Sequence, residues 1–489
     1  MRSLTAIHKK TVALVIFLFG FSFSISFAQE KNNPSFTSSD KELELAFKWA
    51  RSTALHYKGS AGDPVGPWYE SALPPRFAFC MRDVSHQCIG AEILRLSREN
   101  HNMFTLFARN ISGSKDWCSY WEINKWAKPA PADYLNDKEF WYNLPANFDI
   151  LYGTWRMYLW TGDKYYINDP AFTRFQEKTV KDYIDSWVLD ADSLLKRPAH
   201  LNTPIPFNEE NPFHRCRGLP SYSEGVPNLK TGADLVAALY QGLLTYSAIL
   251  TEKGLKDEAV NYAQKAEYYR QKLENEWWDE EQAVYHSYYT NDNKFGKGEG
   301  GTFLLWFDAL KDSNRINKTI THLTSQTWNV ENTSYLPFLF YKNGYWDQAR
   351  KYILYLADPS TQRREYPEVS FGIIEGIVQG LMGITPDART RTISTIFKMN
   401  KPGGAAINQL ALIHTTIDIA HVNNHQSMIT NTGKQPFKWK AMFYGYYRRA
   451  YANGILLPVK KETDIRGRAV SYIELNIMPG KKINVNVEN

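Results

Sequence analysis

The chain has 489 residues, a formal net charge of +6, 29 Gly and 23 Pro. This ordinary glycine and proline content excludes collagen-like and low-complexity proteins. The weak positive charge, without a polybasic block, gives no argument for a nucleic-acid partner. The unusual feature is aromatic content, with 15 Trp, 30 Tyr and 26 Phe. Aromatic faces stack on the CH-rich faces of sugar rings, so this composition favours a carbohydrate partner over the alternative of a merely large aromatic core.

The first 28 residues predict a signal peptide. Arg2, Lys9 and Lys10 form a positively charged start, an apolar run follows, and Ser26-Phe27-Ala28 is a small-x-small cleavage site. The apolar run of about 17 residues is at the lower limit for a membrane span. We therefore expect a soluble protein that is exported to the periplasm or the medium, with no membrane contact after cleavage. The oligomeric state stays open.

Cofactor and metal motifs are missing from the sequence. It contains neither a Gly-rich phosphate loop nor a dinucleotide fingerprint, and its histidines at 414, 421 and 425 match no metal-binding spacing. Export permits disulfides, but buried free thiols are an equal alternative for the four cysteines. These are Cys80, Cys88, Cys118 and Cys216. We expect no metal and no cofactor.

Apolar residues recur at helical spacing through most of the chain. The predicted helices span 40–57, 83–97, 99–110, 147–162, 170–187, 232–252, 255–276, 300–312, 314–325, 333–342, 345–357, 369–382 and 386–397. Several are joined by short breaks, such as Thr161-Gly162-Asp163, Lys253-Gly254 and Asn343-Gly344. Such breaks predict antiparallel helical hairpins.

The pattern changes at Lys401-Pro402-Gly403-Gly404. Alternating apolar and polar residues follow at 412–419, 471–477 and 483–487, and Pro479-Gly480 is a turn signal. The sequence therefore predicts a signal peptide over 1–28, a helical catalytic domain over 29–400 and a small β-rich domain over 401–489.

This layout resembles the six-hairpin glycosidase superfamily. The segments that carry the resemblance are 332–341 (NTSYLPFLFY), 344–350 (GYWDQAR) and 375–387 (EGIVQGLMGITPD). The resemblance implies a mainly α fold, an (α/α)6 toroid of helical hairpins followed by a small C-terminal β-domain. It also implies that the inner helices surround a funnel, with catalytic carboxylates on loops at its wide end.

Glycoside hydrolysis needs two carboxyl groups that flank the bond, so acidic residues in polar surroundings are the candidates. Arg82, Asp83 and His86 lie within one helical turn at a predicted helix start. Asp149 opens another helix, and a role as helix cap is the alternative for both acids. The predicted catalytic residues are Asp83, His86, Asp149, Glu224 and Glu331.

Loops supply the other candidates, with solvated surface charge as the alternative. A Pro- and Gly-rich loop carries Glu224, and long loops in compact domains are often functional. Arginine reads carboxylates by paired hydrogen bonds, and tryptophan stacks on sugars. The predicted substrate-binding residues are Arg82, Trp121, Arg217, Tyr222, Trp328, Arg364 and Glu365.

Three functions fit these residues. The first is acid–base hydrolysis at a chain end of oligosaccharides, with acidic sugars as substrates because of the arginines. The second is a lyase or dehydratase that eliminates across C4–C5 of a uronic acid, with His86 as base, Arg82 at the carboxylate, and Tyr222 or Glu224 as acid. The third is a non-catalytic glycan-binding protein.

Overall fold

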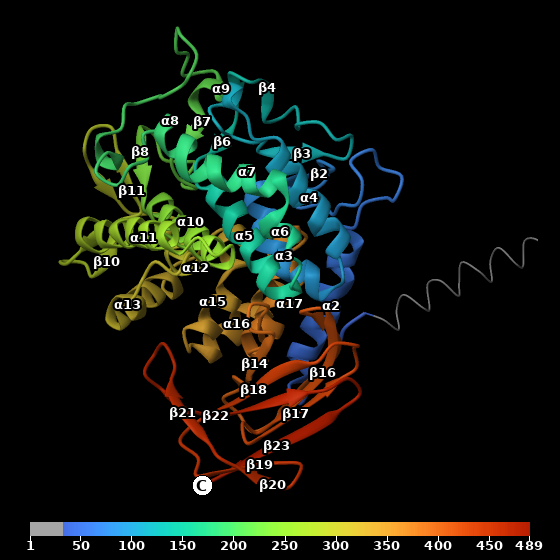
Figure 1. Ribbon diagram of the computed structural model, residues 1–489. Coiled ribbons are helices and arrows are strands. Elements are labelled where there is room, and N and C mark those ends of the chain that lie inside the picture. Colours follow the sequence, from blue (N-terminus) through green and yellow to red (C-terminus); the bar gives the residue numbers. More distant parts are fainter. Residues whose placement is uncertain (1–32) are drawn as a thin grey trace, which may run out of the picture.

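The computed structural model describes residues 33–489, so the predicted signal peptide lies outside the described residues. Helices occupy the first part of this range and strands the last. Figure 1 shows the helices in the upper part of the molecule and the strands of the C-terminal region, orange to red, below them.

Inner helices of the upper part are largely buried and apolar. They are α3 (Met81–Ile93), α5 (Ala146–Thr161), α10 (Ala233–Glu252), α12 (Gly301–Trp306), α15 (Leu336–Lys342) and α17 (Pro367–Glu375). The outer helices are α2 (Lys41–His56), α4 (Ser97–Arg109), α7 (Pro170–Lys178), α11 (Lys256–Glu276), α13 (Ser313–Thr324) and α16 (Trp346–Ala357). Shorter helices are α6 (Tyr165–Asn168), α8 (Ile184–Ser186), α9 (Pro212–Arg215) and α14 (Val330–Thr333), and π-helical turns follow α7 (Thr179–Tyr183) and α17 (Gly376–Leu381).

The inner helices form a closed ring. Each contacts the next in the order α3, α5, α10, α12, α15, α17, and α17 returns to α3. Outer helices pack on this ring: α4 contacts α3 and α5, α11 contacts α10, α13 contacts α12, and α16 contacts α15 and α17. Helix α2, from the other end of the chain, also contacts α17. Within residues 33–489 this is a toroid of six helical hairpins.

Glycines end three of the helices at the breaks that the sequence predicts. Gly162, Gly254 and Gly344 have φ values of 80°, 80° and 81°. A residue with a Cβ is strained in this left-handed conformation, so glycine allows the chain to reverse at once into the next helix. The predicted hairpin turns are confirmed.

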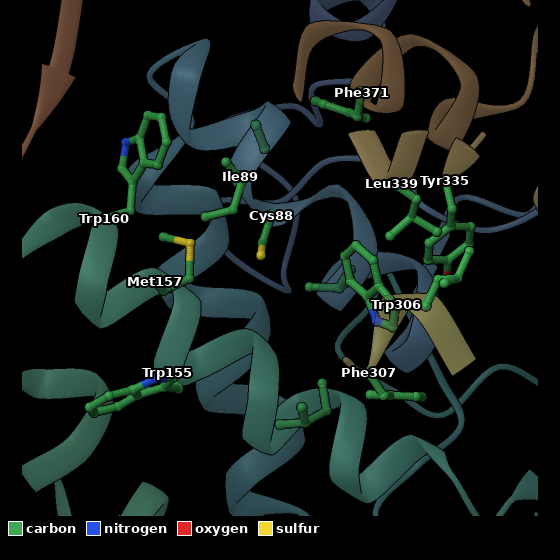
Figure 2. Close-up of a cluster of buried hydrophobic side chains, with 14 of the residues drawn as sticks. Cys88, Ile89, Trp155, Met157, Trp160, Trp306, Phe307, Tyr335, Leu339 and Phe371 are labelled. Atoms are coloured by element: carbon green, nitrogen blue, oxygen red, sulfur yellow. The ribbon is translucent and has the colours of Figure 1, made fainter. Parts of the chain in front are cut away.

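Large side chains fill the space between the inner helices. Figure 2 shows Met157 and Trp160 of α5 beside Cys88 and Ile89 of α3, with Trp306 of α12 nearby. Helix α10 is long and apolar enough to span a membrane, but 89% of its apolar window is buried within the protein. An apolar helix in this position serves as a core element of the ring.

Strands of the C-terminal region form two sheets. The seven-stranded sheet has the order β1-β15-β16-β17-β23-β19-β20, and the five-stranded sheet has the order β13-β14-β18-β22-β21. Their bounds are β1 (Ser35–Ser38), β13 (Thr385–Asp387), β14 (Thr392–Ile396), β15 (Gly404–Leu412), β16 (Thr415–Val422), β17 (Gln426–Asn431), β18 (Phe437–Tyr444), β19 (Arg449–Ala452), β20 (Ile455–Leu457), β21 (Lys460–Thr463), β22 (Ala469–Ile477) and β23 (Lys482–Glu488). Pairings are antiparallel except between β14 and β18.

Short strands shape the loops of the helical ring. They are β2 (Ala78–Cys80), β3 (Glu122–Asn124), β4 (Tyr134–Asn136), β5 (Glu139–Phe140), β6 (Tyr142–Asn143), β7 (Arg217–Leu219), β8 (Leu229–Gly232), β9 (Trp278–Asp279), β10 (Val284–Tyr285), β11 (Tyr288–Thr290) and β12 (Phe295–Gly296). Helices make up 41% and strands 23% of residues 33–489. The predicted mainly α class is therefore too narrow, because the β-region is a substantial part of the fold.

One predicted helix is wrong. Residues 386–397 form parts of strands β13 and β14 instead. The segment Thr392–Ile396 is rich in β-branched residues, which favour strands, and Ile393 is buried between half-buried neighbours. Strands thus begin before residue 401, and β1 joins the same sheet by pairing with β15. All four cysteines are buried and free.

Gly372 permits close contact between two inner segments, and we expect Gly372→Ala to destabilise the protein by about 1–3 kcal/mol. An added Cβ would lie 2.5 Å from the backbone oxygen of Ser334, which cannot move aside as a flexible side chain would. Urea denaturation measures the effect. Gly62→Ala is the control, because its Cβ would meet only the Ser60 hydroxyl at 3.9 Å. Equal stability of the two variants would contradict the prediction.

Candidate active site

Acidic residues from the first turns of several helices gather at one end of the ring. Asp83 of α3, Glu331 of α14 and Glu368 of α17 line the same pocket of about 240 Å³. The positive end of a helix dipole favours carboxylates in its first turn. The other lining residues are Ala72, Leu73, Arg76, Cys80, Arg82, Trp121, Glu122, Asp133, Trp141 and Glu224.

Glu368 is one of the buried carboxyl groups of this pocket, with only 5% of its surface exposed. Burial raises its pKa to about 8, and the nearby negative charges of Asp83 and Glu331 act in the same direction. The positive charge of Arg82 opposes them. At neutral pH Glu368 therefore holds a proton and can donate it.

Asp83 forms an ion pair with its neighbour Arg82. Arg82 Nε donates to Asp83 Oδ1 at 3.1 Å, and its guanidinium lies 5.0 Å from the ring centre of Tyr222. The Tyr222 hydroxyl donates to Asp149, which is buried behind it. Burial raises the pKa of Asp149 to about 7, against the effects of Tyr222 and Arg82. These contacts fix the orientation of Arg82 towards the pocket.

Glu224 lies on a loop that Asp234 holds in place. The Asp234 carboxylate accepts hydrogen bonds from the Tyr222 backbone N–H at 2.6 Å and from the Ser221 hydroxyl at 2.9 Å. Asn143 Nδ2 donates to Glu224 Oε1 at 3.0 Å. The surrounding loops raise the pKa of Glu224 by desolvation, although Arg82 lowers it. Asp234, in the first turn of α10, thus anchors the loop that carries Glu224.

One carboxylate oxygen of Glu331, Oε2, is buried and has no hydrogen-bond partner within residues 33–489. The other oxygen, Oε1, lies 3.4 Å from Arg363 Nη1. Glu299 lies close by, and its carboxylate accepts hydrogen bonds from Asn329 and Asn332. Burial and the charge of Glu331 raise the pKa of Glu299. An unpartnered buried carboxylate oxygen is suited to bind a water or a sugar hydroxyl.

A pair of acids bound to one arginine, Glu122 and Asp133 with Arg76, also lines the pocket. Arg76 Nη1 contacts Glu122 at 2.8 Å and Asp133 at 3.4 Å. Burial and the charge of Asp133 raise the pKa of Glu122 to about 8, although Arg76 opposes them. One proton shared by this pair relieves the repulsion between the two carboxylates. The pocket therefore offers hydrogen-bond donors, at the protonated Glu368 and at the Glu122–Asp133 pair, as well as acceptors.

Solved structures of other proteins share this architecture. An α-L-rhamnosidase from Dictyoglumus thermophilum superposes with a TM-score of 0.58 and 12% identity, over 94% of this chain and 50% of that chain. A putative kojibiose phosphorylase from the human microbiome gives a TM-score of 0.55 and 8% identity, over 98% and 73%. The chain has the six-hairpin glycosidase fold.

A sialidase superposes on the six-hairpin fold as well, with a TM-score of 0.53 and 12% identity, over 90% of this chain and 41% of that chain. The chain spans about half the length of the rhamnosidase. Neither a family model nor a curated protein sequence matches it. Identities this low establish the fold alone.

Five predicted site residues meet in the pocket of the six-hairpin ring. They are Arg82, Asp83, Trp121, Glu224 and Glu331. Tyr222 and Asp149 lie behind this layer and contact it through Arg82. Helix starts and loops that are distant in the sequence are thus brought to one end of the ring.

His86 and Arg217 are enclosed elsewhere in the six-hairpin domain. The His86 ring stacks on Tyr335 at 3.3 Å, and burial together with Arg156 lowers its pKa well below 6.5. Arg217 forms an ion pair with Asp116 and donates to the Lys138 carbonyl at 3.0 Å. Neither side chain lines the acidic pocket.

The remaining predicted binding residues also lie outside the pocket lining. The Arg364 guanidinium covers the Trp49 ring at 4.0 Å, and Glu365 is exposed. Trp328 Nε1 donates to the Leu323 carbonyl at 2.8 Å. These contacts hold loops at the surface of the helical domain.

Sequence reasoning missed Glu368, Glu122 and Asp133. A signal for Glu368 was present, because Pro367 is the first residue of α17 and places Glu368, but not Glu365, in the first turn. Glu122 and Asp133 belong to the Trp-rich segment 117–141, in which nothing local marks two acids as neighbours. Their meeting depends on the pairing of Cys80 with Glu122 across β2 and β3.

Proposed function

We propose that the protein is a carbohydrate-active enzyme of the glycoside hydrolase type. One observation carries the proposal: the pocket combines a carboxyl group that is protonated at neutral pH, Glu368, with the free carboxylate oxygen of Glu331 and the Arg82–Asp83 ion pair. Acid–base hydrolysis needs two carboxyl groups in opposite protonation states. The sugar-active enzymes of the same fold, α-L-rhamnosidase among them, support it by analogy.

The proposed reaction assigns one role to each group. Glu368 donates its proton to the glycosidic oxygen as the bond to the sugar breaks. Glu331 Oε2 accepts the proton of the attacking water, and Asp83, paired with Arg82, lies beside the positive sugar ring of the transition state. Trp121, on the wall of the pocket, supplies an aromatic face for the ring. Glu368 recovers its proton from Glu331 through solvent.

The substrate we propose is the neutral sugar at a chain end. A pocket of about 240 Å³ is smaller than the roughly 300–1,000 Å³ that encloses drug-sized ligands, so it suits a single sugar unit. Of the three arginines that favoured an acidic sugar, only Arg82 lines the pocket, and it is paired with Asp83. The many carboxylates would repel a uronate. Export by the N-terminal signal peptide is part of the same proposal.

Elimination at a uronic acid has less support. The proposed base, His86, is stacked on Tyr335 with its pKa depressed, and Tyr222, one of the two proposed acids, donates its hydrogen bond to Asp149. A weak and enclosed base cannot remove the C5 proton of a bound sugar efficiently.

A substrate panel tests the proposal. The purified protein is incubated with aryl glycosides of neutral sugars and of uronic acids, and products are followed by mass spectrometry and by absorbance near the enol-ether band. We expect a free sugar that has gained water, from a neutral substrate, without new absorbance. Loss of 18 mass units with new absorbance would establish elimination. No turnover on any of the glycosides, with binding retained, would favour the glycan-binding alternative.

The pH dependence of hydrolysis follows from Glu368. Its pKa is raised to about 8, so the proton-donating form is present below that pH and is lost above it. We expect kcat/KM to fall about tenfold per pH unit above roughly pH 8, because only the protonated fraction reacts. A kcat/KM profile from pH 5 to 10 measures this. A fall beginning near pH 5 would contradict Glu368 as the acid.

A further inference from the structure

A second pocket of about 420 Å³ lies between the helical ring and the β-region, away from the acidic pocket. Four segments from both ends of the chain form it: the start of α2, the end of α15, the start of α16 and the linker 398–402 after β14. In Figure 1 these elements lie where the helices above meet the strands below. The two pockets have no lining residue in common.

The lining of this pocket contains polar donors without partners. Within residues 33–489, no carboxylate lies within ion-pairing distance of Lys398 Nζ, and no hydrogen bond is formed by the Tyr341 hydroxyl. Trp346 Nε1 is buried and also lacks an acceptor. Of these three donors, Trp346 Nε1 is fully buried, and a buried donor without a partner costs about 1–3 kcal/mol. Each could be satisfied by acceptor atoms of a bound molecule.

The environment of Lys398 destabilises the charged form of its ammonium group. Burial lowers its pKa to about 8, and the positive charges of Arg468 and Lys342 add to this effect, which Asp464 only partly offsets. Two other cations of the lining are already paired, Arg350 with Asp40 and Glu42, and Lys41 with Glu44. A negative charge placed in the cavity would therefore find Lys398 available and would stabilise its protonated form.

We propose that this cavity is a binding site for a small organic anion, a sugar acid or a sugar phosphate, whose charged group pairs with Lys398 and whose oxygens accept from Tyr341 and Trp346. The aromatic rings of Tyr341 and Trp346 supply an apolar wall for the sugar ring. The site is independent of the proposed hydrolysis. The cavity lies between the helical ring and the β-region, so a bound ligand would also stabilise the contact between these two regions.

Isothermal titration calorimetry of the full chain tests the site. The probes are glucuronate, glucose 6-phosphate and glucose, which share a ring and differ in the charged group. We expect at least one anion to bind and glucose to bind at least tenfold more weakly. Preference between the two anions identifies the charged group. Failure of both anions to bind, or equal binding of glucose, would overturn the proposal.

Matched variants assign the binding to Lys398. Lys398→Met removes the ammonium and keeps the length of the side chain, so the affinity should fall at least tenfold. Lys398→Arg should retain most of it, and Lys434→Met, at an exposed lysine of the β-region, should leave it unchanged. Circular dichroism confirms folding of each variant. Undiminished binding by folded Lys398→Met would refute the site whether or not the protein hydrolyses glycosides.

Discussion

Replacement of Glu368 by Gln is expected to lower kcat/KM by about 10²–10⁴-fold on a substrate with a poor leaving group. The amide keeps the size of the side chain but has no proton to transfer to the glycosidic oxygen. Because burial already keeps Glu368 neutral, the substitution does not remove a charge at pH 7. Folding should therefore be preserved, and steady-state kinetics measures the loss.

The leaving group distinguishes an acid from a residue that only shapes the pocket. A dinitrophenolate departs without protonation, so the loss in Glu368→Gln should shrink to within about tenfold on a dinitrophenyl glycoside. The alkaline fall in kcat/KM should also disappear in this variant. Glu258→Gln is the control, because Glu258 lies in the first turn of the outer helix α11 and is exposed. An equal loss on both leaving groups would contradict general acid catalysis.

Arg156→Met is expected to destabilise the protein by about 3–5 kcal/mol. Arg156 of α5 forms a buried ion pair with Glu375 of α17 and lies over the Trp306 ring at 4.6 Å. Removal of the arginine leaves Glu375 buried without a counter-charge. Guanidinium denaturation at pH 7 measures the change. The penalty should shrink towards pH 5, because protonation of the unpaired carboxyl group removes its charge.

Two further variants separate this effect from the loss of packing. Arg156→Met combined with Glu375→Leu should recover most of the stability, because hydrophobic side chains can replace a buried ion pair. Arg389→Met breaks the exposed pair with Asp387 and should cost less than about 1 kcal/mol. If the double variant is no more stable than Arg156→Met, then lost packing and not the isolated charge explains the effect.

Helical hairpins could be predicted from local sequence. Their apolar spacing and their glycines depend on neighbouring residues only, as at Gly162 and Gly344. The predicted helices therefore lie within a few residues of the observed ones, from α2 to α16. The predicted helix at 386–397 was wrong because this segment, rich in β-branched residues, forms the strands β13 and β14. Its pairing partner, β18, lies some 45 residues away in the chain, as in Thr392 with Lys438.

The candidate site was predictable only in part. Arg82, Asp83 and Glu224 stand out by local polar density, and the pocket contains all three. Glu365 and Glu368 differ by only three positions, but the helix start at Pro367 turns one towards solvent and buries the other. The polar sequence around Arg217 resembles that around Arg82, but Arg217 pairs with Asp116 from a distant loop and does not reach the pocket. The local density of polar residues does not show which of these side chains will line the pocket.

By itself the sequence determined the helices, their turns and the supply of acidic residues at helix starts, because hydrogen bonding and backbone conformation act over a few residues. The tertiary structure decided which acids meet. Closure of the ring by α17 against α3 brings Glu368 to Asp83, nearly 300 residues apart in the chain. Only this approach raises the pKa of Glu368 to about 8, because burial and like charge depend on neighbours in space.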